Sequence, residues 1–352
     1  MSGSLENYSI HICLESELTE LQQFIHDHWK NNHALSTSKK LMDWQHCDEE
    51  NKLFNFVVAK HLITNEIHGV LGFIPTYHFD KTIKDIDLWL AIWKVRDDIN
   101  VSGLGLSLLT FLVSCKQPRS ISAFGLSPKV IPIYKYMGYN IGILNHYYII
   151  NDRIREFHLI GNFDGHYHSD AITVDEKKLI HYEKSDFFQL SAKLNIFASN
   201  MQIPTKSHSY LYYRYFCHPI YNYHVYGVMS QDSIVGFLVF RLSSYNSSHA
   251  LRLVDYFGDA DGLSGTYREF QRLLQAYNAE YVDFYNIGIK EKVLLDSGFN
   301  KRDSTSKVII PNYFEPFEKK NVDLDYAYRC NDKFNFAICK GDSDQDRPNL
   351  VL

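Results

Sequence analysis

Apolar residues recur along the chain with two periods, one typical of helices and one typical of strands. After Ser16, which stands where an N-cap belongs, apolar side chains recur at helical spacing through residues 17–30. The pattern favours strands at 54–60 and 68–77, separated by a polar turn. The run 88–95 is apolar almost throughout, which is typical of a strand buried on both faces.

The order of predicted elements in the first half of the chain returns in the second half. The first half reads as two helices, three strands, a helix, a strand and a helix, with a last strand at 140–150. A polar connection at about 151–182 is followed by helices and strands predicted at 186–197 (helix), 209–216 (helix), 223–229, 234–242 and 250–257 (strands), 265–277 (helix), 280–285 (strand) and 290–296 (helix). Residue identity between the halves is small, so this duplication rests on element order. We therefore expect a mixed α/β fold of two tandem domains, residues 1–160 and 161–352, each with a mixed sheet flanked by helices.

The turn after the strand at 88–95 is the first candidate for chemistry. There Gly103-Leu104-Gly105 closes a polar turn and opens an apolar, helix-like segment that stops before Pro118. A strand that ends in a glycine turn and feeds a helix places backbone N–H groups and the positive end of the helix dipole around one point. The sequence therefore predicts an anion site at this turn.

A short helix with a glycine stop follows further along the chain. A strand is predicted at 120–126, and the helix at 129–137 begins just after Pro128. Pro132 falls in its first turn, where a missing N–H donor costs little. Gly138 then ends the helix.

Composition excludes one large class of partner. The chain has 352 residues, which favours two domains, and 36 Lys plus Arg stand against 41 Asp plus Glu, a formal charge of −5. Nucleic-acid binding needs a concentrated basic face, and no block of basic residues occurs. We therefore expect no nucleic-acid partner.

Metal and membrane motifs are also missing from the sequence. The six cysteines form no CxxC pair, and no HExxH occurs among the seventeen histidines. The aspartates of 342–346 are spaced like a calcium loop, but the glycine precedes them and no glutamate follows at the right distance. The longest apolar segment, 101–115, is too short for a bilayer, and the N-terminus carries no leader pattern. We expect a cytoplasmic protein without a metal or a membrane span.

Two stretches carry a resemblance to a known family. The first is Asn100-Val101-Ser102-Gly103-Leu104-Gly105 and the second is Ile133-Tyr134-Lys135-Tyr136-Met137-Gly138-Tyr139. Together they resemble the GNAT acyltransferase superfamily, which carries Arg/Gln-x-x-Gly-x-Gly/Ala after the fourth strand and, later, a short helix that ends in Gly-aromatic. Asn100 departs from the family's Arg or Gln, which puts the side-chain contact to pyrophosphate in doubt but not the backbone contacts.

The resemblance implies acyl-CoA as cosubstrate. The pyrophosphate would lie on the turn, and the pantetheine arm would enter where the strands splay at Trp93 and Ser120. Tyr134 occupies the family's proton-donor position, although a core aromatic is as credible in a chain with 25 tyrosines. Ser127 either contacts the cofactor or only caps the next helix. The implied cofactor residues are Trp93, Val95, Asn100, Val101, Ser102, Gly103, Gly105, Leu106 and Ser127.

The second half lacks the glycine motif. In its place stands the acidic stretch 255–262, where Asp259 and Asp261 would repel pyrophosphate. We therefore expect only the first half to bind acyl-CoA and the second half to hold the acceptor. The paired halves and the aspartate-rich tail resemble bacterial sugar N-acyltransferases, which acylate nucleotide-linked aminodeoxy sugars such as dTDP-3-amino-3,6-dideoxyhexoses with acetyl-CoA or a hydroxyacyl-CoA such as 3-hydroxybutanoyl-CoA, for surface polysaccharide.

Candidates for a base and for acceptor contacts come from the second half. Asp255 and Asp283 stand in apolar strands, where a carboxylate is either functional or part of a structural salt bridge. Asn286 ends the same run as Asp283 and could hold a sugar hydroxyl. His166 lies in a polar loop, as a base or as a surface histidine. The tail residues Asp342, Asp344 and Arg347 either fold over the sugar or belong to a solvated terminus, although Phe334, Phe336 and Ile338 alternate as in a strand.

The expected reaction is direct N-acylation, since no cysteine falls in a nucleophile context. Two alternatives stay open. One is an aminoacyl transferase of the paired GNAT-like type that takes charged tRNA as donor, against which the acidic balance argues. The other is a non-catalytic binding protein with this fold. Neither the base, the acyl length, the sugar nor the oligomeric state follows from the sequence.

Overall fold

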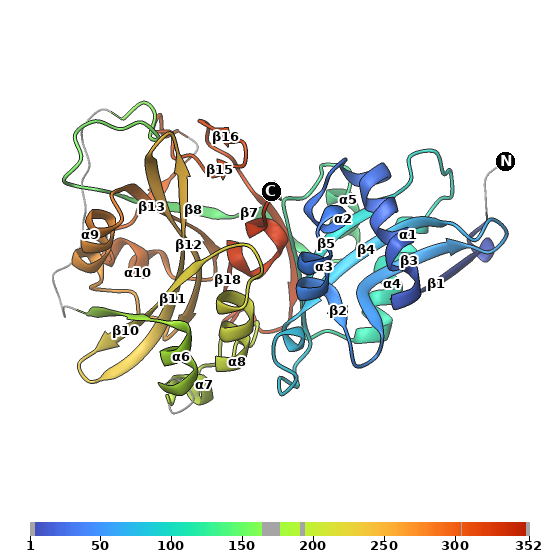
Figure 1. Ribbon diagram of the computed structural model, residues 1–352, viewed down its shortest axis with the longest axis horizontal. Coiled ribbons are helices and arrows are strands. Elements are labelled where there is room, and N and C mark those ends of the chain that lie inside the picture. Colours follow the sequence, from blue (N-terminus) through green and yellow to red (C-terminus); the bar gives the residue numbers. More distant parts are fainter. Residues whose placement is uncertain (1–3, 164–176, 191–193, 304, 350–352) are drawn as a thin grey trace.

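Two mixed sheets, each flanked by helices, lie side by side in the computed structural model (Figure 1). It describes residues 4–163, 177–190, 194–303 and 305–349. In the described part the first sheet has the order β1-β3-β4-β5-β6-β17-β7, with β2 beside β3. Its strands are β1 (Tyr8–Leu14), β2 (Cys47–Asp48), β3 (Leu53–His61), β4 (Ile67–Pro75), β5 (Asp87–Val95), β6 (Ser120–Phe124), β7 (Asn140–Ile143) and β17 (Asp325–Cys330).

The second sheet has the order β14-β8-β13-β12-β11-β10-β9, with β18 beside β13. Its strands are β8 (Asn145–Ile150), β9 (Lys178–Tyr182), β10 (Tyr223–Ser230), β11 (Ser233–Tyr245), β12 (Ser248–Gly258), β13 (Ala279–Ile287), β14 (Asn300–Arg302) and β18 (Ile338–Cys339). A separate hairpin pairs β15 (Tyr313–Phe314) with β16 (Phe317–Glu318). The predicted mixed α/β class is confirmed.

Helices lie against both sheets and follow the predicted order. The longer ones are α1 (Leu18–Phe24), α3 (Lys39–His46), α4 (Leu104–Lys116), α5 (Ile131–Tyr136), α6 (Lys184–Leu190), α9 (Tyr267–Ala276) and α10 (Glu291–Asp296). The short ones are α2 (Ala34–Thr37), α7 (Ile196–Ser199), α8 (His208–Leu211) and the turns η1 (Leu5–Asn7), η2 (Glu15–Glu17), η3 (Ile25–Trp29), η4 (Thr76–His78), η6 (Tyr212–Phe216), η7 (Lys340–Asp342) and η8 (Asp344–Asp346). None of the helices described is both long and apolar enough to cross a membrane.

The two sheets exchange strands, which the sequence did not predict. We expected 140–150 to complete the first sheet, but the chain leaves it at Leu144, and β8 pairs antiparallel with β13 of the second sheet. In return, β17 from the C-terminal region inserts between β6 and β7. The predicted domain limit at residue 160 stays a prediction, but the sheets do not divide there.

The two sheets also share a hydrophobic core. Ile74, Phe79 and Trp89 of the first half pack in one cluster with Tyr210 and Leu211 of α8. A fully buried side chain of this size stabilises a fold by about 1.5–3 kcal/mol. Contacts between the halves therefore belong to the core of the molecule.

Candidate functional site

The glycine turn forms one wall of a cavity at the start of α4. Gly103 is the N-cap of α4 and has φ of 82°, a left-handed conformation that a residue with a Cβ adopts only with strain. The N–H groups of the next three residues have no partner inside the helix, because a first turn never has one. The cavity of about 460 Å³ is lined by Val95, Val101, Gly103, Leu104, Gly105, Leu106, Pro132, Ile133 and Tyr136.

Five of the nine predicted cofactor residues therefore meet at this cavity: Val95, Val101, Gly103, Gly105 and Leu106. Asn100 and Ser102 are exposed in the same turn without lining it. Trp93 lies directly behind it, since its indole Nε1 donates a hydrogen bond of 3.2 Å to the Gly105 carbonyl. Ser127 is exposed, and its Oγ accepts a 3.4 Å hydrogen bond from the N–H of Lys129, so it caps the turn before α5.

Four residues of the cavity wall were not among the predicted site residues. Leu104 follows Gly103 directly, but Pro132, Ile133 and Tyr136 come from α5. The sequence predicted the helix itself without any sign of which side faces the turn. Proline in the first turn of a short helix was the only available signal.

Strands β5 and β6 separate next to this cavity. Their parallel pairing runs from Asp87 opposite Ser120 to Leu90 opposite Ala123. Beyond Leu90, β5 continues to Val95 with no neighbour from β6, so backbone groups on that side of β5 lack a partner among the described strands. The register of β5 against β4 also shifts there, which indicates a bulge. We expected the opening at Trp93 and Ser120; it does lie at Trp93, but Ser120 is at the paired end.

Tyr134 lies on α5 beside the opening. Its side chain is 2% exposed, and its ring meets those of Trp93 and Tyr139 edge-on, with centroids 5.5 Å and 5.0 Å apart. Burial raises the pKa of the Tyr134 phenol, so the group keeps its proton at neutral pH. A protonated phenol is what a proton donor needs, and the contacts are also those of a core aromatic.

Asp255 lies in a buried polar cluster of the second half. Its two carboxylate oxygens are 2.5 Å from Lys206 Nζ and 2.7 Å from the Tyr215 hydroxyl. Asp342 Oδ1 lies 2.7 Å from the same Lys206 ammonium. Asp255, Cys339 and Asp342 offer atoms close enough for a metal, but Lys206 already places a cation between the two carboxylates.

Asp283 is held in a second buried cluster. Both of its oxygens accept from Arg252, and His146 Nε2 lies 3.2 Å away. Burial alone would raise the pKa of this carboxyl, but Arg252 and His146 lower it to about 2. Asp255 and Asp283 are thus both paired inside the second half, and neither lines the cavity at the glycine turn.

Asn286 and the tail complete the account of the predicted acceptor residues. Asn286 is fully buried, and its carboxamide has no hydrogen-bond partner among the described residues. Asp344 Oδ2 pairs with Arg347 Nη1 at 2.9 Å, and the Asp344 and Arg347 side chains are only 6% and 16% exposed. The tail is therefore packed into the protein, as the alternation at 334–338 indicated, although Phe334 itself is 90% exposed. His166 lies outside the described residues.

In the second sheet, the chain's own C-terminal strand occupies the position that corresponds to the opening. Parallel pairing of β12 with β13 ends at Leu253 opposite Phe284. Beyond that point β18 pairs with β13, so that Cys339 lies opposite Asn286. A Cβ on the following Gly341 would come within 2.8 Å of the Val254 carbonyl. β18 thus fills this position in the second sheet, and binding of acyl-CoA by the first half alone stays a prediction.

Comparison of the sequence with protein-family profiles gives no match, and comparison with curated proteins gives none either. Solved structures do match. A GCN5-related N-acetyltransferase from Anabaena variabilis (11% identity, TM-score 0.54) and a probable N-acyltransferase from Enterococcus faecalis (8%, 0.55) each cover 92% of this chain and 72% of their own. A GCN5-related N-acetyltransferase from Kribbella flavida (11%, 0.51) covers 93% and 72%. The protein has the fold of the GCN5-related N-acetyltransferases.

Proposed function

We propose that the protein is an acyltransferase that takes its acyl group from acyl-CoA in the first half of the chain. The observation that carries this proposal is the separation of β5 from β6 beside the start of α4. The Leu104 N–H already donates to the Val101 carbonyl at 3.4 Å, so the N–H groups of Gly105 and Leu106 are the ones that suit the CoA pyrophosphate. The unpaired edge of β5 suits the pantetheine amides, which can add to it as an extra strand would.

The reaction we infer is direct attack of an amine on the thioester. A C–N bond forms, the C–S bond breaks, and the departing thiolate takes a proton from the Tyr134 hydroxyl. An unpaired N–H of β5 would stabilise the oxyanion. The proton lost by the amine goes to water, and the Tyr134 oxygen takes a proton back from water. Asp255 and Asp283 are both held in buried ion pairs and do not line the cavity, so neither is placed to take the amine proton.

For the acceptor we propose a nucleotide-linked aminodeoxy sugar, held by the second half and acylated in the cytoplasm for surface-polysaccharide synthesis. The resemblance of the sequence to such transferases supports this choice. In the second sheet, β18 occupies the position that corresponds to the opening in the first sheet. This supports an acceptor-binding role for the second half, because it leaves that half without a comparable place for the cofactor.

Isothermal titration with CoA and acetyl-CoA tests the proposal. We expect one site per chain for each, and release of CoA thiol when dTDP-3-amino-3,6-dideoxyglucose is added with acetyl-CoA. Absence of CoA binding would contradict the proposal and favour a binding protein with this fold. Binding of charged tRNA in place of CoA would favour an aminoacyl transferase.

A further inference from the structure

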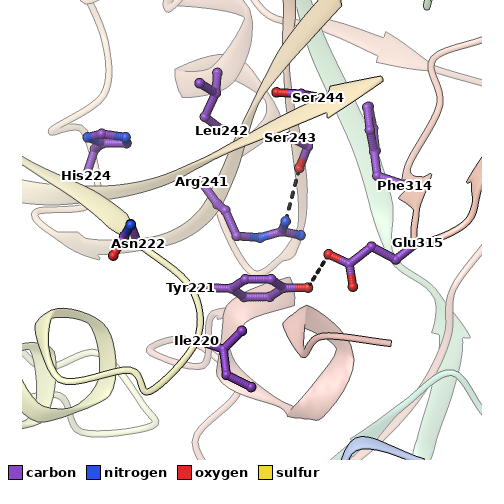
Figure 2. Close-up of a pocket in the computed structure, with 10 residues that line it drawn as sticks. All are labelled: Ile220, Tyr221, Asn222, His224, Arg241, Leu242, Ser243, Ser244, Phe314 and Glu315. Carbon is purple, nitrogen blue, oxygen red and sulfur yellow. Dashed lines mark hydrogen bonds between the residues drawn. The ribbon is translucent and has the colours of Figure 1, made fainter. Parts of the chain in front are cut away.

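A second cavity lies in the second half, away from the glycine turn (Figure 2). Its volume is about 420 Å³. The loop before β10 supplies Tyr221 and Asn222, the end of β11 supplies Arg241 and Ser244, and the hairpin strand β15 supplies Phe314. Three segments far apart in the sequence thus converge on one hollow, and no sequence motif marked any of these residues.

The charged side chains of this cavity wall already have partners in the protein. The Arg241 guanidinium lies over the Tyr221 ring, 4.2 Å from its centre, and Asp346 accepts from it at 2.7 Å. The other charged wall residue, Glu315, accepts a 2.8 Å hydrogen bond from the Tyr221 hydroxyl, as Figure 2 shows, and another from the Asn349 N–H. Burial lowers the pKa of His224, so its ring is neutral at pH 7. No spare cation is present in this wall for a phosphate.

The rest of the wall is uncharged and combines polar groups with the apolar side chains of Ile220, Leu242 and Phe314. Asn222 and Ser244 stand exposed at the rim, and Tyr221 and Phe314 provide aromatic surface. Aromatic rings together with a few amide and hydroxyl groups match a ligand ring that has an apolar face and hydroxyl groups at its edge. A sugar ring and the ribosyl part of a nucleoside share this chemistry.

The C-terminal tail connects this cavity to the opening between β5 and β6. Asp346 holds Arg241 of the cavity wall. Its neighbour Gln345 donates through Nε2 to the Phe124 carbonyl at the end of β6, 3.4 Å away, and packs on Gly125. Adjacent Cα atoms are about 3.8 Å apart. Adjacent residues of the tail thus contact the cavity wall on one side and the end of β6 on the other.

We propose that this cavity binds the uncharged, hydroxylated ring portion of the acceptor substrate, with the reactive amine directed towards the opening between β5 and β6. The proposal rests on the acyltransferase function proposed above. It assigns acceptor recognition to Tyr221, Asn222 and Phe314, in place of the acidic tail, whose carboxylates are already paired with protein cations.

Two variants test it. Tyr221→Leu removes the aromatic floor, and Asn222→Trp fills the rim from an exposed position without removing a packed side chain. We expect each to raise the KM for dTDP-3-amino-3,6-dideoxyglucose at least tenfold and to leave the Kd for CoA unchanged. Tyr245→Leu is the control, because Tyr245 is a partly exposed tyrosine on the same strand β11 that packs on Phe317 outside the cavity.

The outcomes separate this proposal from the proposed function. Unchanged acceptor KM in both variants, with CoA binding and acetyl transfer intact, would overturn the cavity assignment alone. Absence of CoA binding in the wild type would overturn the proposed function first. Saturation-transfer NMR with thymidine and with methyl 3-amino-3,6-dideoxyglucopyranoside identifies which ring occupies the cavity. A saturation-transfer signal from either probe that is lost in Asn222→Trp supports the assignment. Absence of a signal from both probes contradicts it.

Discussion

At the scale of single residues, Trp93 joins the parts of the candidate site. Its indole donates a hydrogen bond to the Gly105 carbonyl and packs against the Tyr134 ring. The glycine turn and Tyr134 could be predicted because their signals are local. The roles of Asp255 and Asp283 could not, because their partners Lys206 and Arg252 stand tens of residues away in the sequence and become neighbours only in the fold.

Replacing Tyr134 with phenylalanine tests its role as proton donor. We expect kcat to fall at least tenfold with the Kd for CoA unchanged, because the ring packing stays and only the hydroxyl is lost. The control is Tyr245→Phe, since Tyr245 is an exposed tyrosine on β11 that packs on Phe317 and does not line the cavity at the glycine turn. An acetyl thioester whose thiol has a low pKa can release its thiolate without a proton donor. With that substrate, the difference in kcat between the wild type and Tyr134→Phe should be smaller. A loss smaller than tenfold would leave Tyr134 as a core aromatic.

Replacing Asp283 with asparagine tests the buried ion pair. Arg252 would remain buried without its counter-charge, so we expect a loss of about 3–5 kcal/mol in the free energy of unfolding, measured with urea. The folded pKa of about 2 lies below the ordinary value near 4, so this stabilisation is present above pH 4 and is lost as the pH falls towards 2. In Asp283→Asn, the free energy of unfolding should therefore fall less between pH 4 and pH 2 than it does in the wild type. Asp97→Asn, at an exposed ion pair, should leave the unfolding midpoint unchanged.

Lys340 predicts a pH dependence of the opposite kind. Burial, with Arg252 nearby, lowers the pKa of Lys340 to about 7. Between pH 7 and about 10 the unfolded chain therefore holds a proton that the folded chain does not, and stability rises with pH by up to about 1.4 kcal/mol per unit. Unfolding experiments at pH 7 and 9 should show a smaller rise for Lys340→Met than for the wild type. Equal rises would contradict the pKa assignment.

At the scale of elements, most helices and strands follow from the local period of apolar residues, because each buries one face or both. The sequence did not predict β17, because buried and exposed residues do not alternate along this strand. Both of its faces are only partly buried. The exchange at Leu144 was also missed, since 140–150 reads as one strand and nothing in its sequence indicates that its two ends join different sheets. Pairing between distant strands depends on tertiary contacts that no local pattern carries.

The start of α4 gives a prediction at this scale. Gly103→Ala and Gly138→Ala place a Cβ at left-handed positions with φ of 82° and 77°, so both should lose about 1–2 kcal/mol of stability. Of the two, only Gly103 itself lines the cavity, whereas Gly138 follows the C-terminal end of α5 and does not line it. We expect the Kd for CoA, measured by titration, to rise at least fivefold for Gly103→Ala and to stay unchanged for Gly138→Ala. Equal effects would show that the turn is structural only.

At the scale of the whole molecule, the C-terminal segment connects both halves. In Figure 1 the C-terminal segment, coloured red, runs between the two halves. It completes the first sheet with β17, fills the second with β18, and places the carboxylates of η7 and η8 against cations of the second half. From composition alone, the aspartate-rich tail could also have been a solvated terminus. The burial of 338–346 excludes that alternative for this part of the tail.

Separate halves should therefore fail to fold. We expect residues 1–160 expressed alone to give a poorly dispersed NMR spectrum and no cooperative thermal transition, because the position between β6 and β7 is empty without β17. Supplying the fragment 161–352 in trans should restore cooperativity. Cooperative unfolding of 1–160 alone would contradict a shared fold.

The inserted strand β17 also sets an order of events during synthesis. Its position in the first sheet lies between strands made much earlier, so that sheet stays incomplete until residues 325–330 have been translated. At about 5–20 residues per second, the wait lasts on the order of ten seconds or more. During that time the β6 and β7 edges present unpaired N–H and C=O groups, which attract other strands. Efficient production in the cell should therefore depend on chaperones that bind nascent chains, and slower translation should lengthen the time for which these edges stay exposed.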